Sequence, residues 1–125
     1  MKELTKAEQQ IMEYLWQLGE GFVKDIRDKF PEPKPAYNTV STIIRILEKK
    51  QVVGHRTLGK SHQYYPLVTP EEYRKLRLRD VLSKHFNNSY KRFVSFFTRE
   101  EDLSVKELEE IQRIIEEEIH QRKNQ

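Results

Sequence analysis

The chain has 125 residues and a formal net charge of +3, with 36% hydrophobic and 34% charged residues, which suits one domain or a small domain with an appendage. It has no cysteine, which excludes disulfides, thiol catalysis and cysteine-bound zinc or copper, and it has no apolar run long enough to span a membrane. Because the first residues also lack an apolar signal core, we expect a soluble, cytoplasmic protein without membrane insertion.

Two short helices are predicted at the start of the chain. Thr5-Lys6-Ala7-Glu8 has the form of a capping box, and the helix that it begins ends near Gly19. The expected inner face of this helix consists of Ala7, Ile11, Leu15 and Leu18. A second helix is predicted within residues 22–30, before the proline-rich segment 31–35 breaks it.

The third predicted helix, residues 37–50, has two unlike faces. The apolar residues at the spacing of a buried stripe are Val40, Ile43, Ile44 and Leu47. The residues about half a turn away are Asn38, Ser41, Thr42, Arg45 and Lys49. A face that is merely solvated usually carries long charged side chains, so these short hydrogen-bonding groups indicate a binding surface.

The segment after Lys50 changes to the pattern of two strands. Residues 52–57 and 62–66 are rich in β-branched and aromatic side chains, and residues 58–61 between them hold a glycine at the turn. Three helices followed by a hairpin predict a winged helix-turn-helix, a mainly α fold with a small β-hairpin. Residues 36–66 hold five Lys or Arg and one acid, so positive charge is concentrated as nucleic-acid binding would require.

Three further helices are predicted after the hairpin. Thr69-Pro70-Glu71-Glu72 is a second capping box, and its helix extends to about Phe86, where residues 87–89 break it. Residues 90–97 show the helical apolar spacing again, and Ser104-Val105-Lys106-Glu107 is a third capping box that begins the last helix.

The expected boundary separates a winged-helix domain, residues 1–68, from a helical dimerisation domain, residues 69–125. The second piece is too small to bury its apolar stripes alone, so its helices either fold back on the first domain or pair with a second copy. Pairing is favoured because homodimers are the commonest assembly. The residues assigned to this dimer seam are Val81, Leu82, Phe86, Tyr90, Phe93, Val94, Phe97, Leu108, Ile111 and Ile115.

Pairing would direct two copies of the third helix at a palindromic site in double-stranded DNA. Asn can pair with adenine and Arg with guanine, whereas Lys49, Lys50, Arg56 and Lys60 would mostly hold phosphates. The candidate recognition-helix residues are Asn38, Thr39, Ser41, Thr42, Arg45 and Lys49. The candidate wing residues are Arg56, Lys60 and His62.

Other interpretations stay open at this point. The polar face of the third helix could be merely solvated, or it could dock a protein partner and make the chain a winged-helix interaction module. His55 and His62 could suggest a metal pair, but they lack further ligands at a chelating spacing, so no metal or cofactor is expected. No catalytic motif occurs in the sequence, so we do not expect an enzyme.

Four stretches, "LTKAEQQIMEYLW", "AYNTVSTIIRILEKK", "GKSHQYYPLVTPEEY" and "EEDLSVKELEEIQRII", resemble the penicillinase-repressor (BlaI/MecI/CopY) family over nearly the whole chain. The resemblance implies a bacterial transcriptional repressor with an N-terminal winged helix and C-terminal dimerisation helices, bound at inverted-repeat operators in front of resistance genes. It places the recognition helix on Asn38 through Lys49, the wing on Arg56 to His62, and the dimer seam on Val81 to Ile119.

The resemblance also implies how repression ends. In the β-lactam branch of the family, a membrane receptor-protease pathway cuts the repressor near an Asn-Phe bond that precedes an acidic "EDLS". Here "EDLS" stands at 101–104 and the matching pair is Phe96-Phe97, so the implied proteolytic region departs from the family pair. The copper-sensing branch has a cysteine-rich tail that this chain lacks, so copper sensing is not expected.

Overall fold

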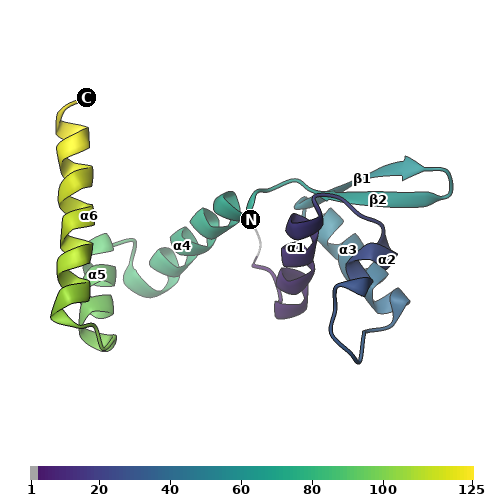
Figure 1. Cartoon of the computed structure of the whole chain (residues 1–125), viewed down its shortest axis with the longest axis horizontal. Coiled ribbons are helices and arrows are strands. Elements are labelled where there is room, and N and C mark those ends of the chain that lie inside the picture. Colours follow the sequence, from purple (N-terminus) through teal and green to yellow (C-terminus); the bar gives the residue numbers. More distant parts are fainter. Residues whose placement is uncertain (1–2) are drawn as a thin grey trace. The chain divides into compact units, whose positions relative to one another are not determined.

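The computed structural model describes residues 3–125, which form helices and one antiparallel hairpin (Figure 1). In chain order the elements are α1 (Lys6–Leu18), α2 (Val23–Asp28), α3 (Tyr37–Lys49), β1 (Val53–Leu58), β2 (Ser61–Pro66), α4 (Pro70–Phe86), α5 (Tyr90–Glu100) and α6 (Val105–Lys123). The predicted fold class is confirmed, and the helices expected after Thr5, Thr69 and Ser104 begin directly after these residues. Within the described residues, no helix is long and apolar enough to cross a bilayer.

The chain divides into two compact units, Met1–Leu78 and Arg79–Gln125. The division falls inside α4, so the first half of this helix belongs to the N-terminal unit. Trp16 of α1 contacts the residues around the start of α4. Its indole Nε1 donates a hydrogen bond to the Val68 carbonyl at 2.8 Å, and its ring lies 5.7 Å from the ring of Tyr73. The functional boundary between residues 68 and 69 stays a prediction.

The core of the N-terminal unit lies where α1, α2 and α3 meet (Figure 1). As predicted for α3, Val40, Ile44 and Leu47 are buried, and Ile43 packs against them. Because this apolar stripe faces inward along the whole helix, the opposite polar face of α3 is turned to solvent.

The buried face of α1 differs from the predicted one at its start. Ile11 and Leu15 are buried as expected, but Ala7 is exposed, and Glu8, with 3% of its surface exposed, takes the inner position. Ala7 offers only a methyl group for burial, whereas the carboxylate of Glu8 gains hydrogen bonds inside.

Glu8 joins the beginning of α1 to the end of α3. Its Oε1 accepts hydrogen bonds from the Thr5 backbone N–H and from Lys50 Nζ, both at 2.8 Å. Burial acts to raise the pKa of Glu8, but the hydrogen bonds from Lys50 and Thr5 outweigh it, so this pKa lies below its ordinary value. Lys50, expected from the sequence to contact phosphate, therefore makes a structural contact with its ammonium group.

We expect this pair to make the N-terminal unit sensitive to acid. Because folding lowers the pKa of Glu8, the stabilisation is fully present above the ordinary value of 4.5 and is lost as the pH falls through the folded value. Urea unfolding followed by circular dichroism should show that Glu8→Gln starts with a lower free energy of unfolding at pH 6, and that this free energy declines less toward pH 3 than in the unmodified protein. Equal declines in the two proteins would contradict the role of the pair.

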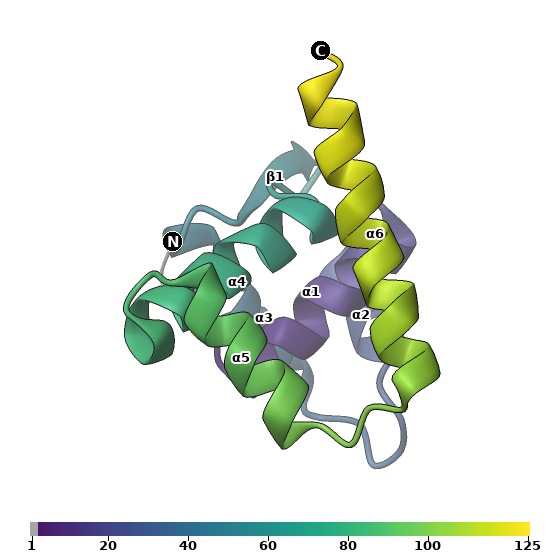
Figure 2. The same ribbon diagram turned by 90° about the vertical axis from the view of Figure 1, so that its left-hand side faces the viewer.

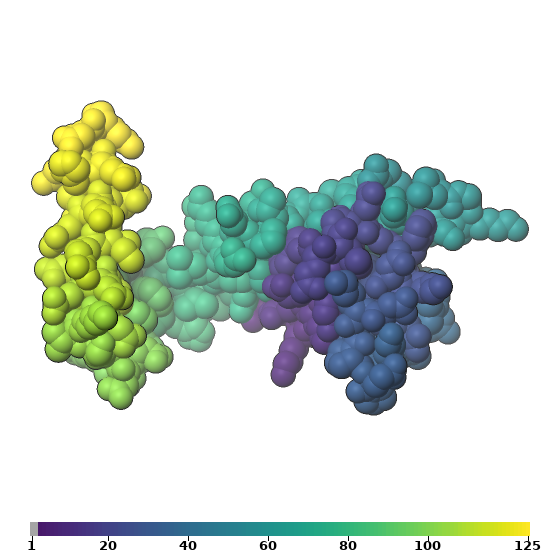
Figure 3. All heavy atoms as spheres, in the orientation of Figure 1, coloured from purple at the N-terminus to yellow at the C-terminus, as the bar shows by residue number. Residues whose placement is uncertain are grey.

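The hairpin is a wing anchored to the helices at its base. β1 and β2 pair in antiparallel register from Val53 with Pro66 to Leu58 with Ser61, and Gly59 makes the turn at a φ of 64°, which glycine adopts without strain. Between α1 and α2, Gly21 exchanges two backbone hydrogen bonds with Tyr64, of 2.9 and 2.8 Å. The end of the hairpin protrudes from the N-terminal unit (Figure 3). Three helices followed by this hairpin confirm the predicted winged helix-turn-helix.

The helices of the second unit have almost no interior of their own. Leu82 of α4 is buried, with 2% of its surface exposed, whereas no residue of α5 or α6 is buried. Phe86 packs its ring against those of Phe93 and Phe96, each at a centroid distance of 5.4 Å. A short loop then joins α5 to α6 (Figure 2). The C-terminal helices thus leave most of their apolar surface uncovered in a single chain.

Candidate nucleic-acid interface

The outer face of α3 presents its polar side chains to solvent. Of the predicted set, the exposed residues are Asn38, Thr39, Thr42, Arg45 and Lys49, and Ser41 is half-buried. Thr42 Oγ1 donates a hydrogen bond to the Asn38 carbonyl at 2.8 Å, and Arg45 Nη2 donates one to Ser41 Oγ at 3.3 Å. Neither bond uses the side-chain amide of Asn38, and the Arg45 guanidinium keeps further N–H donors. The face therefore offers the donors and acceptors that base edges require.

Arg56 of β1 is held on the wing by two neighbours. Its Nη2 forms an ion pair with Glu20 Oε2, and its guanidinium carbon lies 5.3 Å from the centre of the Tyr65 ring. The ring orients the cation, while the ion pair is exposed on both sides and therefore weak. Arg56 can exchange its carboxylate partner for a phosphate without losing its support on Tyr65.

Lys60 lies at the turn of the hairpin, next to Gly59. Its side chain is exposed and forms no hydrogen bond or ion pair with any residue in the range 3–125. A flexible ammonium group in this place suits a contact with phosphate, which needs charge but little directional precision.

Two histidines lie together on the wing and connect it to α3. The ring centroids of His55 and His62 are 4.3 Å apart in an edge-to-face arrangement, and His55 Nδ1 contacts Glu48 Oε2 of α3. His62 Nδ1 lies 3.4 Å from Thr57 Oγ1. Among residues 3–125, no three or more His, Cys, Asp or Glu side chains are placed to hold a metal ion.

Two polar residues near the predicted site are not indicated by sequence patterns. Tyr37, the first residue of α3, is 54% exposed, although an aromatic residue beside an apolar stripe is usually assigned to a core. Ser61 is the first residue of β2 and gives no signal of its own. For Tyr37, the sequence signal is its position directly before Asn38, at the start of the polar face.

These residues help to line a pocket between α3 and the wing. Its volume is about 140 Å³. The polar lining residues are Tyr37, Ser41, Lys60, Ser61 and His62, with Val23 and Tyr64 completing the wall. The pocket joins predicted recognition-helix and wing residues into one surface.

The residues predicted for the dimer seam differ in exposure. Leu82 is buried, the half-buried ones are Val81, Phe86, Phe93, Phe97 and Ile111, and the exposed ones are Tyr90, Val94, Leu108 and Ile115. In a protein of this size, such a set of uncovered apolar side chains indicates an interaction surface.

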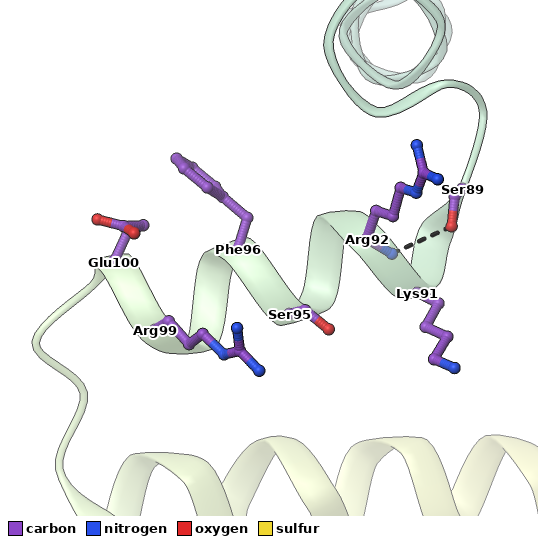
Figure 4. Close-up of a pocket in the computed structure, with 7 residues that line it drawn as sticks. All are labelled: Ser89, Lys91, Arg92, Ser95, Phe96, Arg99 and Glu100. Atoms are coloured by element: carbon purple, nitrogen blue, oxygen red, sulfur yellow. Dashed lines mark hydrogen bonds between the residues drawn. The ribbon is translucent and has the colours of Figure 1, made fainter.

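α5 also carries a hollow of about 490 Å³, which is lined by other residues than those predicted for the seam. Figure 4 shows Lys91 and Arg99 on one side of α5 and Phe96 on the other, while the Ser89 hydroxyl caps the helix by accepting from the Arg92 N–H at 3.1 Å. α6 carries six glutamates and four Lys or Arg, whereas α5 carries three Lys or Arg and one glutamate. The net charges of the two helices are therefore opposite in sign.

The pair Phe96-Phe97, implied as a proteolytic region, lies inside α5. Phe96 is 54% exposed, but the peptide bond between the two residues is part of a regular helix. A protease that binds extended backbone would first have to unwind α5 locally, and cleavage at this place stays a prediction.

Comparison with known proteins places the chain among repressors. The penicillinase repressor family model matches residues 4–117. The methicillin resistance regulatory protein MecI of Staphylococcus aureus (strain N315) is 26% identical over 114 residues, which cover 90% of this chain and 93% of MecI. The penicillinase repressor of Bacillus licheniformis is 21% identical over 122 residues, which cover 97% of this chain and 95% of that protein. A solved CopR repressor structure is 31% identical, with a TM-score of 0.46, and the match covers 54% of this chain and 99% of the solved chain. Since the family match extends over most of its length, the chain belongs to the penicillinase repressor family.

Proposed function

We propose that this protein is a dimeric repressor that binds inverted-repeat DNA operators through α3 and the wing. As a family member it is a transcriptional repressor of the BlaI/MecI type, and its relatives are named as repressors and regulatory proteins, not as enzymes. The observation that carries the proposal is the exposed face of α3, where short polar groups and Arg45 stand beside a cationic wing. A face of this composition fits base edges better than a protein partner, which usually requires aromatic or aliphatic anchors.

In this proposal the two parts of the site have different tasks. Asn38 pairs with adenine and Arg45 with guanine in the major groove, because their amide and guanidinium groups match those base edges bidentately. Arg56 and Lys60 contact phosphates and position the protein without reading sequence.

The second unit supplies the pairing surface. Burying one large apolar side chain stabilises a protein by about 1.5–3 kcal/mol, and Leu108, Ile115 and Ile119 are all exposed in a single chain. A second copy fits this surface, because it brings the same apolar stripe and because acidic α6 and basic α5 attract each other. Two linked winged helices would then reach two half-sites.

Substitution should separate the two tasks of the interface. Arg45→Ala is expected to weaken binding to the operator by about 1–3 kcal/mol and to affect random duplexes less. Lys60→Ala should instead weaken binding to all sequences about equally and lower the slope of log K against log salt by about 1. Fluorescence anisotropy with operator and scrambled duplexes at several salt concentrations measures both effects. If the two variants behave alike on both duplexes, the assignment of roles is wrong.

The function itself is tested by a gel shift with the promoter of the protein's own gene and competitor DNA. We expect a retarded complex whose binding constant falls steeply as salt is added, because formation of the phosphate contacts releases counterions from the DNA. The absence of any retarded complex at micromolar dimer would favour the alternative, in which the face of α3 docks a protein partner and the chain is an interaction module.

A further inference from the structure

The pocket between α3 and the wing has the lining of a site for an oxyanion. Lys60 contributes a positive charge, Tyr37, Ser41 and Ser61 contribute hydroxyl groups, and His62 contributes an imidazole. Hydroxyls and cations donate hydrogen bonds to anions, and none of the residues that line the pocket is acidic. The volume of about 140 Å³ leaves room for one phosphate group.

The donors of this pocket are available to a ligand. The side chains of Tyr37, Lys60 and Ser61 form no hydrogen bond or ion pair with other residues of the described chain. Ser41 Oγ accepts from Arg45 at 3.3 Å, which leaves its own O–H to donate. His62 has only its Nδ1 near a hydroxyl, at 3.4 Å from Thr57 Oγ1, so its Nε2 remains to donate.

The place of the pocket selects the kind of anion. If α3 lies in the major groove, the wing beside it reaches toward the DNA backbone that borders this groove. The pocket lies between α3, represented by Tyr37 and Ser41, and the wing, represented by Lys60 to His62. A backbone phosphate therefore comes to this place when α3 enters the groove.

We propose that this pocket holds one backbone phosphate of the duplex, an inference that rests on the proposed DNA-binding function. The hydrogen-bond donors to this phosphate are Tyr37, Ser61 and protonated His62, beside the ammonium group of Lys60. A single phosphate then touches α3 and the wing at once, and it fixes their common orientation on the DNA. Because an imidazole gains its charge between pH 8 and pH 5, DNA affinity rises as the solution becomes more acidic.

Titratable and charged groups lie close to His62. Those with a ring contact to it or lining the pocket with it are His55 of β1, Tyr37 of α3, Lys60 of the turn and Tyr64 of β2. Glu48 of α3 contacts His55, and Arg45 of α3 acts electrostatically on Tyr64. In the proposal the bound phosphate gives the charged form of His62 a partner of opposite sign, so protonation of His62 and DNA binding favour each other.

The pH dependence of binding gives the first test. For the full-length protein on a 30-base-pair duplex, we expect the dissociation constant to decrease by about fivefold from pH 8 to pH 6 at constant salt. In His62→Gln, the change in log Kd between pH 8 and pH 6 should be less than about half of that in the unmodified protein. The control His85→Gln removes an exposed histidine of α4 and should leave this change in log Kd unaltered. An unaltered pH dependence in His62→Gln overturns the proposal.

Neutral phosphate replacement gives the second test and locates the contact. Single methylphosphonates are placed in turn along the duplex, and binding is compared between the unmodified protein and the double variant Tyr37→Phe, Ser61→Ala. We expect one position per half-site at which the replacement weakens the unmodified protein by about tenfold and the double variant by less than about threefold. If the effects of variant and replacement add at every position, no phosphate lies in the pocket.

The two tests distinguish this inference from the proposed function. Binding that is tight but indifferent to His62 and additive at every phosphate overturns the pocket assignment and leaves DNA binding intact. If no duplex is bound at any pH, the proposed function itself fails.

Discussion

Replacing Ile115 of α6 by aspartate is expected to convert the proposed dimer into monomers at micromolar concentration. Ile115 is 47% exposed in a single chain and lies in the middle of the apolar stripe of α6. In a dimer each copy would lose the burial of this exposed part, about 0.7–1.5 kcal/mol, and each would bury a charge without a partner. Because two-fold symmetry doubles the loss, pairing should weaken by at least about 100-fold, which sedimentation equilibrium measures directly.

A matched control separates loss of pairing from loss of the helix. Arg113→Asp introduces the same residue on the opposite side of α6, at an exposed position, and should remain dimeric. Operator affinity should fall with Ile115→Asp and stay nearly unchanged with Arg113→Asp. A dimeric Ile115→Asp protein would show that this stripe is not the pairing surface.

The second large effect is expected from the core below the polar face of α3. Ile44→Ala should lower the free energy of unfolding of the N-terminal unit by about 2–5 kcal/mol, because it opens a cavity at a side chain with 0% exposure. Whole domains are stable by only about 5–15 kcal/mol, so DNA binding should become temperature-sensitive as well. Urea unfolding followed by circular dichroism measures the loss.

The neighbouring Ile46 offers the control for this substitution. It lies on the same helix but is 42% exposed, so Ile46→Ala should cost less than about 1 kcal/mol. Comparable losses from Ile44→Ala and Ile46→Ala would mean that α3 does not pack through the face described.

The features that could be predicted from the sequence are those fixed by near neighbours in the chain. The capping box at Thr5 and Glu8 involves two residues three apart, and both of its hydrogen bonds are present. The stripe of α3 needs only helical spacing, and Val40, Ile44 and Leu47 are buried accordingly. These patterns were sufficient for the fold class and for the outward direction of the polar face.

The features that could not be predicted depend on residues far apart in the chain. Glu8 is buried because Lys50, 42 residues later, reaches its carboxylate. The pocket between α3 and the wing brings together Tyr37, the first residue of α3, and Ser61, the first residue of β2. No periodic pattern in the sequence connects the turn of a hairpin with the start of a helix. Assignment of single residues to bases or phosphates stays a prediction for the same reason, since it depends on where the DNA lies.

Trp16 is the one tryptophan of the chain, and its indole connects α1 to Val68 and Tyr73. Its fluorescence emission therefore reports whether α1 still contacts the residues around the start of α4, and α5 and α6 add no indole to that signal. Emission spectra follow the winged helix alone, whereas hydrodynamic methods follow association of the whole chain. A variant that sediments as a single chain with an unshifted emission maximum has lost association while its N-terminal unit remains folded.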